Sequence, residues 1–304
     1  MSYLDLYQSG ELKDRLRKAR SLLKSCRVCP RECNVNRLED ETGTCRTGAQ
    51  AMISSFGAHF GEEKPLVGNH GSGTIFFTNC NLHCIYCQNY DISQLGQGER
   101  VSKETLAQMM LSLQNQGCHN INLVSLTHVV PQILEALAVA VELGFNIPLV
   151  YNSGGYDSLE TLAILDGIID IYMPDMKYSD EKTAEELSGI TEYPAINRAA
   201  VKEMHRQVGD LEIDENGVAQ KGLLIRHLVL PNGLAGTAEI VKFIAEEISP
   251  NTYVNIMDQY YPSYKAREIP SLTRRITREE YQEAVKLTRE AGIHRLDKVH
   301  LPIL

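Results

Sequence analysis

The sequence predicts an α/β protein, built as a partial TIM-like (β/α)6 barrel with a small Cys-rich module in front of it. Beyond residue 73, short apolar or β-branched runs alternate with segments of helical periodicity, and glycines or prolines separate them. Seven of the eight cysteines form two tight groups, one before this alternation and one directly after its first strand. We therefore expect two domains, a helical and Cys-rich metal-binding module in residues 1–73 and the barrel in residues 74–304.

Capping residues and apolar periodicity define the first three units. Ser102 is a suitable N-cap for the first helix and Gly117 a suitable stop, while Pro131 fits the first position of the second helix. These strands and helices are predicted at residues 74–78 and 102–116, 120–125 and 131–143, and 147–151 and 159–165.

The second half of the chain continues the alternation. Asn216 and Gly217, between two apolar runs, predict a tight hairpin before the fifth strand, and Thr277 with Glu280 forms a capping box for the last helix. Six strands instead of eight predict an incomplete barrel, with its chemistry at the carboxyl ends of the strands. The remaining predicted elements are strand 170–173, helices 180–188 and 194–208, a fifth strand ending at 230–231, helix 237–248, strand 252–257 and a helix from 277 to 292.

Charge is unevenly distributed along the chain. Thirty Lys and Arg residues against 39 Asp and Glu give a net charge of −9. Residues 1–50 carry ten basic and seven acidic side chains, so this segment is +3 and the remainder is −12. An acidic body is poorly suited to phosphate binding, so we expect no nucleic-acid partner. Without a signal-peptide pattern or an apolar stretch of the ~20 residues that span a bilayer, we expect a cytoplasmic protein that does not contact membranes.

The second cysteine group directly follows the first predicted strand. Cys80, Cys84 and Cys87 form a C-x3-C-x2-C array. A [4Fe–4S] cluster normally takes four Cys ligands, so three would leave one iron open to another ligand. A zinc site that adds His83 is the alternative, although adjacent His83 and Cys84 would need a strained geometry to reach the same ion.

This array, with an aromatic residue directly before its third Cys, resembles the signature of the radical S-adenosylmethionine (radical SAM) superfamily. The segments GSGTIFFTNCNLHCIYCQNYDIS, VYNSGGYD, IYMPDMKY and VNIMDQYYP are similar to uncharacterised iron–sulfur proteins related to pyruvate formate-lyase-activating enzymes. The resemblance implies that a [4Fe–4S] cluster binds S-adenosyl-L-methionine (SAM) and cleaves it reductively. The 5′-deoxyadenosyl radical would then abstract hydrogen from a substrate, as in an activating-enzyme-like oxidoreductase.

The resemblance also implies which residues bind SAM. Tyr86 occupies the aromatic position beside the adenine, and Asp175 with Lys177 matches a D-x-K pattern whose Lys approaches SAM. Asn152 and Ser153 stand where some activating enzymes hold a monovalent cation, although an Asp is expected at the first position. Many relatives have Gly-Gly-Glu after the second strand, and the polar residues that replace it here are Ser125, Thr127 and His128.

Three further residues are expected to line the mouth of this site: Arg226, Gln259 and Tyr260. A charged side chain on a buried strand needs a partner, which bound SAM or an acidic residue would supply. A purely structural ion pair remains the alternative for Arg226 and for Lys177, and a hydrogen-bonded structural role remains the alternative for His128.

Cys26, Cys29, Cys33 and Cys45 form the first cysteine group. Four thiolates at short spacing satisfy either a tetrahedral zinc ion or a second iron–sulfur cluster, so the site would be closed. Cys118 stands apart and is expected to be a packing residue.

Two other hypotheses compete with that of an activase-like enzyme. In one, the protein is a radical SAM enzyme that modifies RNA or a metabolite. In the other, it is a non-catalytic, metal-dependent protein-binding module. For the favoured reading the expected partners are an electron donor such as flavodoxin or ferredoxin and a protein substrate. The substrate itself has no readable signal in the sequence, because fold does not determine function.

Overall fold

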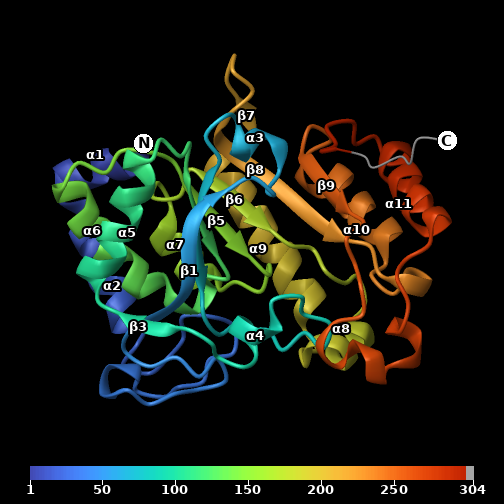
Figure 1. Cartoon of the computed structure of the whole chain (residues 1–304), viewed down its shortest axis with the longest axis horizontal. Helices are drawn as coiled ribbons and strands as arrows, with labels where there is room; N and C mark the ends of the chain where they lie inside the picture. Colours follow the sequence, from blue (N-terminus) through green and yellow to red (C-terminus); the bar gives the residue numbers. More distant parts are fainter. Residues whose placement is uncertain (299–304) are drawn as a thin grey trace.

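In the computed structural model, which describes residues 1–298, nine strands of these residues form one mostly parallel sheet and confirm the α/β class (Figure 1). The strands are β1 (Ala51–His59), β2 (Ser72–Phe77), β3 (Glu99–Val101), β4 (Ile121–Val124), β5 (Leu149–Ser153), β6 (Ile171–Pro174), β7 (Glu212–Ile213), β8 (Ala219–Leu228) and β9 (Tyr253–Met257). The helices are α1 (Ser2–Ser9), α2 (Glu11–Ser21), α3 (Lys64–Val67), α4 (Tyr90–Ser93), α5 (Lys103–Asn115), α6 (Val130–Glu142), α7 (Leu159–Leu165), α8 (Glu181–Ser188), α9 (Tyr193–Val208), α10 (Thr237–Phe243) and α11 (Arg278–Glu290).

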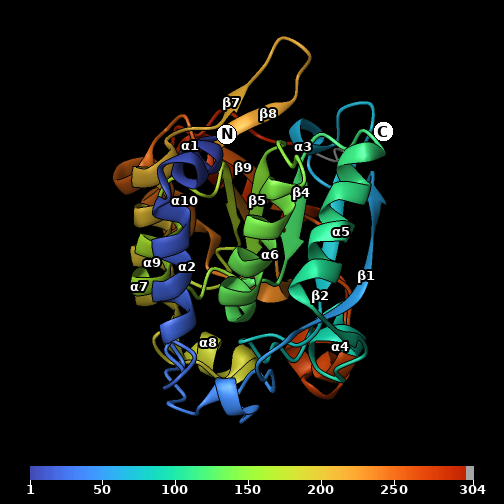
Figure 2. The same cartoon turned by 90° about the vertical axis from the view of Figure 1, so that its left-hand side faces the viewer.

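The six predicted parallel strands are present and adjacent in the expected order. β2, β4, β5, β6, β8 and β9 pair side by side in parallel, and β7 forms the predicted hairpin with β8. Helices α2, α5, α6, α7 and α9 cover the outer face of the sheet (Figure 2). The sheet does not close, which agrees with a partial barrel.

The sheet also contains two strands that the sequence did not predict. β1 pairs antiparallel with β2 and with β3, and the boundary expected at residue 73 falls inside β2 (Ser72–Phe77). Helices α1 and α2 pack against α6, and their buried residues belong to the same core as those of β2 and β4. Residues 1–73 are therefore continuous with the barrel in sheet and core.

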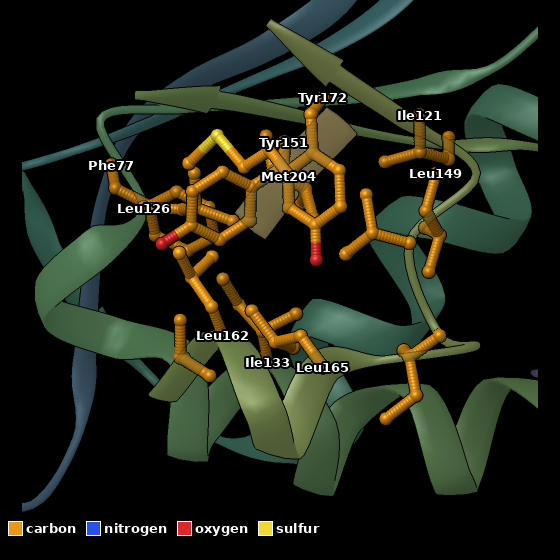
Figure 3. Close-up of a cluster of buried hydrophobic side chains, with 14 of the residues drawn as sticks. Phe77, Ile121, Leu126, Ile133, Leu149, Tyr151, Leu162, Leu165, Tyr172 and Met204 are labelled. Atoms are coloured by element: carbon orange, nitrogen blue, oxygen red, sulfur yellow. The ribbon is translucent and has the colours of Figure 1, made fainter. Parts of the chain in front are cut away.

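The main core lies between the sheet and its outer helices (Figure 3). Leu149, Tyr151 and Tyr172 project from β5 and β6 toward Leu162 of α7 and Met204 of α9, and all five side chains are buried. Because side chains alternate along a strand, the intervening residues of β5 and β6 face the barrel interior. One face of each strand is thus used for packing and the other is free for a site.

A short plug fills part of the barrel interior. Leu66 of α3 is fully buried and packs with Val150 of β5, Ile171 and Met173 of β6 and Leu224 of β8. The chain from β1 to β2 therefore passes inside the barrel and fixes the residues just before α3 against the inner wall. In residues 1–298 no helix is both long enough and apolar enough to cross a bilayer.

The predicted capping box at α11 is present and supports a testable prediction. Glu280 N donates to Thr277 Oγ1 (3.2 Å) and Thr277 N donates to Glu280 Oε2 (2.8 Å). Arg274 chiefly, with the backbone N–H groups of Thr277 and Asn232, lowers the pKa of Glu280 to about 2. Glu280 thus contributes stability above its unfolded pKa of about 4.3, and this contribution is lost as the pH falls toward 2.

We expect Glu280→Gln to destabilise the protein by about 1 kcal/mol at pH 7, because the charged cap is lost. The difference from the wild type should shrink as the pH falls from about 4.3 toward 2, because the carboxylate is protonated first in the unfolded state and then in the folded state. Urea denaturation followed by circular dichroism would measure both. Glu283→Gln, on the same helix, is the matched control, and an equal loss in that variant would contradict the assignment.

Candidate functional site

The Cys80 array lies at the carboxyl end of β2, where the parallel sheet presents a cavity. Asn79 adopts a left-handed backbone (φ 71°) and turns the chain out of the strand. Cys80, Cys84 and Cys87 line a cavity of about 370 Å3 at this end of the barrel. The residues predicted to surround the array from β5, β6 and β8 line the same cavity.

Each of the three sulfur atoms has a hydrogen-bonding neighbour. Leu82 N donates to Cys80 Sγ (3.4 Å), Ser188 Oγ donates to Cys84 Sγ (3.0 Å), and Ser93 Oγ lies 3.2 Å from Cys87 Sγ. Burial raises the pKa of Cys80 to about 12 and also raises that of Cys87, so their thiolates need a nearby positive charge such as iron. Three donor-supported sulfur ligands beside a cavity fit an iron–sulfur cluster with one open iron.

The zinc alternative with His83 has no support in the structure. His83 Nδ1 lies 3.2 Å from Gln94 Oε1, which gives the imidazole a protein partner. Within residues 1–298, no three or more His, Cys, Asp or Glu side chains are already gathered around a metal position, and this holds for both cysteine groups as well as for His83.

Asp175 is the centre of a buried ion network at the end of β6. Its Oδ1 accepts from Arg226 Nε (2.9 Å) and its Oδ2 from Lys177 Nζ (2.6 Å). Arg226 also donates through Nη2 to Asn152 Oδ1 (2.8 Å), which joins β8 to β5. Burial would raise the pKa of Asp175, but Arg226 and Lys177 together hold it below its ordinary value. Asp175 and Lys177, which were predicted to bind SAM, therefore also form the structural ion pair that was the alternative prediction.

The polar residues after β4 and β5 have different positions relative to the cavity. Ser125 lines the cavity in a left-handed conformation (φ 60°). Ser153 also lines it, but its hydroxyl donates to Asp157 Oδ2 (2.7 Å). Thr127 donates to the other oxygen of the same buried carboxylate (2.7 Å) and does not line the cavity. Asn152 Oδ1 and the Ser153 hydroxyl are thus both engaged by other side chains, while Ser125 presents its hydroxyl at the cavity wall.

Tyr86 lines the cavity and is held by other tyrosines. Tyr178 donates to the Tyr86 hydroxyl (2.6 Å), and Tyr178 in turn lies 2.7 Å from Ser188 Oγ, the group that donates to Cys84. The Tyr260 ring packs 6.0 Å from that of Tyr86. The sequence did not indicate Tyr178 or Ser188, because neither belongs to a local motif around the cysteines.

Like Thr127, two further predicted residues do not line the cavity. Tyr260 is fully buried behind Tyr86 and donates to the carbonyl of Leu272 (2.8 Å), whereas neighbouring Gln259 does line the cavity. His128 is buried behind the Cys80 loop, where its Nε2 lies 3.0 Å from the carbonyl oxygen of Thr78. Burial lowers the pKa of His128 to about 3, so the ring is neutral near pH 7 and its place is structural.

The first cysteine group lies directly against the Cys80 loop. Arg31 Nε donates to the carbonyl of Asn81 (3.0 Å), and Arg46 Nη2 donates to that of Ser93 (3.2 Å). Cys26, Cys29 and Cys45 are buried, Cys33 is partly buried, and all four are free thiols. The metal site predicted for these four residues stays a prediction.

Further polar residues in the cavity wall had no signal in the sequence. Glu62 and Glu63 follow β1, Asn255 lies on β9, and Gln88 follows the cysteine array. Glu63 and Asn255 meet because the segment after β1, at one side of the open sheet, approaches β9 at the other side. Asn255 was detectable only as a polar residue at an inward position of an otherwise apolar strand.

Replacing the centre of the ion network should be costly. Asp175→Asn would leave Arg226 and Lys177 without the carboxylate that both contact, so we expect a loss of about 3 kcal/mol in the free energy of unfolding. Urea denaturation of the cluster-free protein would measure it. Asp166→Asn breaks the exposed Asp166–Arg206 pair (2.6 Å) and should cost less than about 1 kcal/mol. Equal effects of the two substitutions would contradict the central role of Asp175.

Comparison with known proteins gives the family. The sequence model of the radical SAM superfamily matches residues 74–218. An uncharacterised protein of Methanocaldococcus jannaschii is 34% identical over 282 residues, which cover 90% of this chain and 77% of the relative.

Two solved structures are similar at a low level. A radical SAM methyltransferase from Sphaerobacter thermophilus has a TM-score of 0.47 and 12% identity, covering 72% of this chain and 64% of that chain. SuiB of Streptococcus suis, bound to its precursor peptide SuiA, has a TM-score of 0.48 and 12% identity, covering 73% of this chain and 47% of that chain. This chain therefore spans less than two thirds of either one. The match over residues 74–218, which contain the Cys80 array, shows that the chain belongs to the radical SAM superfamily.

Proposed function

We propose that this protein cleaves SAM reductively and uses the product to take a hydrogen atom from a substrate, as an activating-enzyme-like oxidoreductase does. The observation that carries the proposal is the common cavity of Cys80, Cys84, Cys87 and the Asp175 network at the carboxyl ends of the strands. Superfamily membership supports the reaction class, since it implies a [4Fe–4S] cluster and SAM.

In this proposal Cys80, Cys84 and Cys87 hold the cluster. When bound, the cluster would supply the electron for reductive cleavage of SAM and so the radical chemistry of the proposed reaction. The chain contributes hydrogen bonds to the sulfur ligands from Leu82 and Ser188, which tune the charge they carry.

SAM would be held by groups from four strands. Lys177 has three donors, of which Asp175 uses one, so its ammonium can also bind the SAM carboxylate. Tyr86 offers a ring face to the adenine, and Ser125 a hydroxyl at the end of β4. Asn152 and Ser153 complete the set at the end of β5. The apolar lining residues Phe76, Leu228 and Met257 would exclude water from the reacting atoms.

A protein or peptide substrate is supported by the surface next to the cavity. Phe60 is 62% exposed and lies between His59 and Gly61, which both line the cavity. An exposed aromatic side chain at the rim of a site is typical of contacts with other chains. The proposed electron donor is a small redox protein such as flavodoxin or ferredoxin.

The decisive experiment is anaerobic. The reconstituted protein, reduced with dithionite and given SAM, should form 5′-deoxyadenosine, measured by liquid chromatography. Cys84→Ala should abolish both the cluster absorbance and the product, because one of three ligands is lost. Cys118→Ala removes a buried thiol outside both groups and should retain both signals. No product from a wild type with a full cluster would contradict the proposed function.

We also propose that Cys26, Cys29, Cys33 and Cys45 bind zinc or a second iron–sulfur cluster. Four thiols within twenty residues match the ligand number of either group. Metal analysis of anaerobically purified protein should show more than the catalytic cluster contains, and Cys29→Ala should remove the excess. A wild type with only ~4 Fe and no Zn per chain would contradict a second site.

A further inference from the structure

The cavity wall contains a buried carboxylate that the proposed function does not use. Glu63, directly before α3, lines the cavity and is only 4% exposed. Its Oε1 accepts from Asn255 Nδ2 on β9 (2.9 Å), whereas its buried Oε2 accepts no hydrogen bond from any of residues 1–298. A buried oxygen without a partner is costly, and a native protein that retains one commonly uses it to bind something.

Glu63 is fixed in this position by the residues that follow it. Leu66 is fully buried among side chains of β5, β6 and β8. Lys64 N lies 3.4 Å from Asp297 Oδ1, which also accepts from Tyr253 on β9 (2.8 Å). These two contacts hold the backbone that carries Glu63 against the inner wall of the barrel.

The cations near Glu63 are already engaged. Arg226 donates to Asp175 and Asn152, and its Nη1 lies 4.0 Å from Glu62 Oε2. Glu62 Oε1 lies 3.4 Å from His59 Nδ1. Burial raises the pKa of Glu63, opposed by Arg226 and reinforced by Glu62. This side of the cavity thus presents two adjacent carboxyl groups that share Arg226, and Glu63 Oε2 accepts no hydrogen bond from residues 1–298, so it attracts donors and repels anions.

We propose that Glu63 Oε2 is the anchor for a protonated amine of the substrate, bound between the residue 59–63 segment and β9. An ammonium group supplies the missing hydrogen bond to Oε2 in its strong, charge-assisted form. A substrate that presented a carboxylate or phosphate here would face Glu62 and Glu63. The identity of the amine as part of the substrate rests on the proposed function, but the binding site itself needs neither the cluster nor SAM cleavage.

The test compares three probes with the same three-carbon chain: n-propylammonium, n-propanol and propionate. Ligand-observed NMR titration of the full-length protein, with and without SAM, gives their affinities. We expect propylammonium to bind at least tenfold more tightly than either other probe. Glu63→Gln keeps the shape and should reduce propylammonium binding at least tenfold, while the exposed Glu215→Gln should leave it unchanged.

Two results would overturn the inference. One is equal binding of the three probes to the wild type, which would remain informative even if Glu63→Gln failed to fold. The other is a Glu63→Gln variant that keeps its propylammonium affinity or loses SAM affinity, since the latter would assign Glu63 to the cofactor. Formation of 5′-deoxyadenosine by the wild type is scored separately, so failure of the proposed function would be recognised as such.

Discussion

The buried carboxylate of Asp175 holds the working end of this molecule together. Through Arg226 and Asn152 it connects β6 to β8 and β5, and through Lys177 it fixes a cation at the cavity wall. Neither cation is placed there by apolar packing, because a buried ammonium or guanidinium is unfavourable without a partner. Backbone pairing spaces these strands, and this one anion fixes the polar side chains that their ends present to the cavity.

Around this anion, packing and hydrogen bonds hold both the strands and the Cys80 loop in place. The outer faces of β5 and β6 are fixed by Tyr151, Tyr172 and the helices over them, so their inner faces present side chains from a stiff wall. The Cys80 loop is held from several sides, by Ser188 at one sulfur and by Arg31 and Arg46 at its backbone. A cluster bound here would therefore sit in a frame that the protein has already built.

The sequence predicted the parallel strands and the Cys80 array well because both signals are local. Apolar runs bounded by Gly or Pro mark the six parallel strands, and the cysteine spacing needs no distant residue to be recognised. β1 was missed because most of its residues are exposed or half-buried, which leaves no alternating pattern. Glu63 was missed because its partner Asn255 lies 192 residues away in the chain. Tyr260 and Gln259 are neighbours in sequence, but Tyr260 packs against Tyr86 while Gln259 lines the cavity. The sequence does not distinguish these two positions.

The antiparallel pairing of β1 with β2 has a consequence for how the chain can be divided. The superfamily match begins at residue 74, inside β2, so a fragment cut there would lose its edge strand, the Leu66 plug and the arginines that support the cysteine loop. Such a fragment would expose an unpaired strand edge and an apolar hole, both of which promote aggregation. The smallest unit expected to fold therefore includes the N-terminal segment, and an expression fragment or a chimera should keep it with the strands that follow.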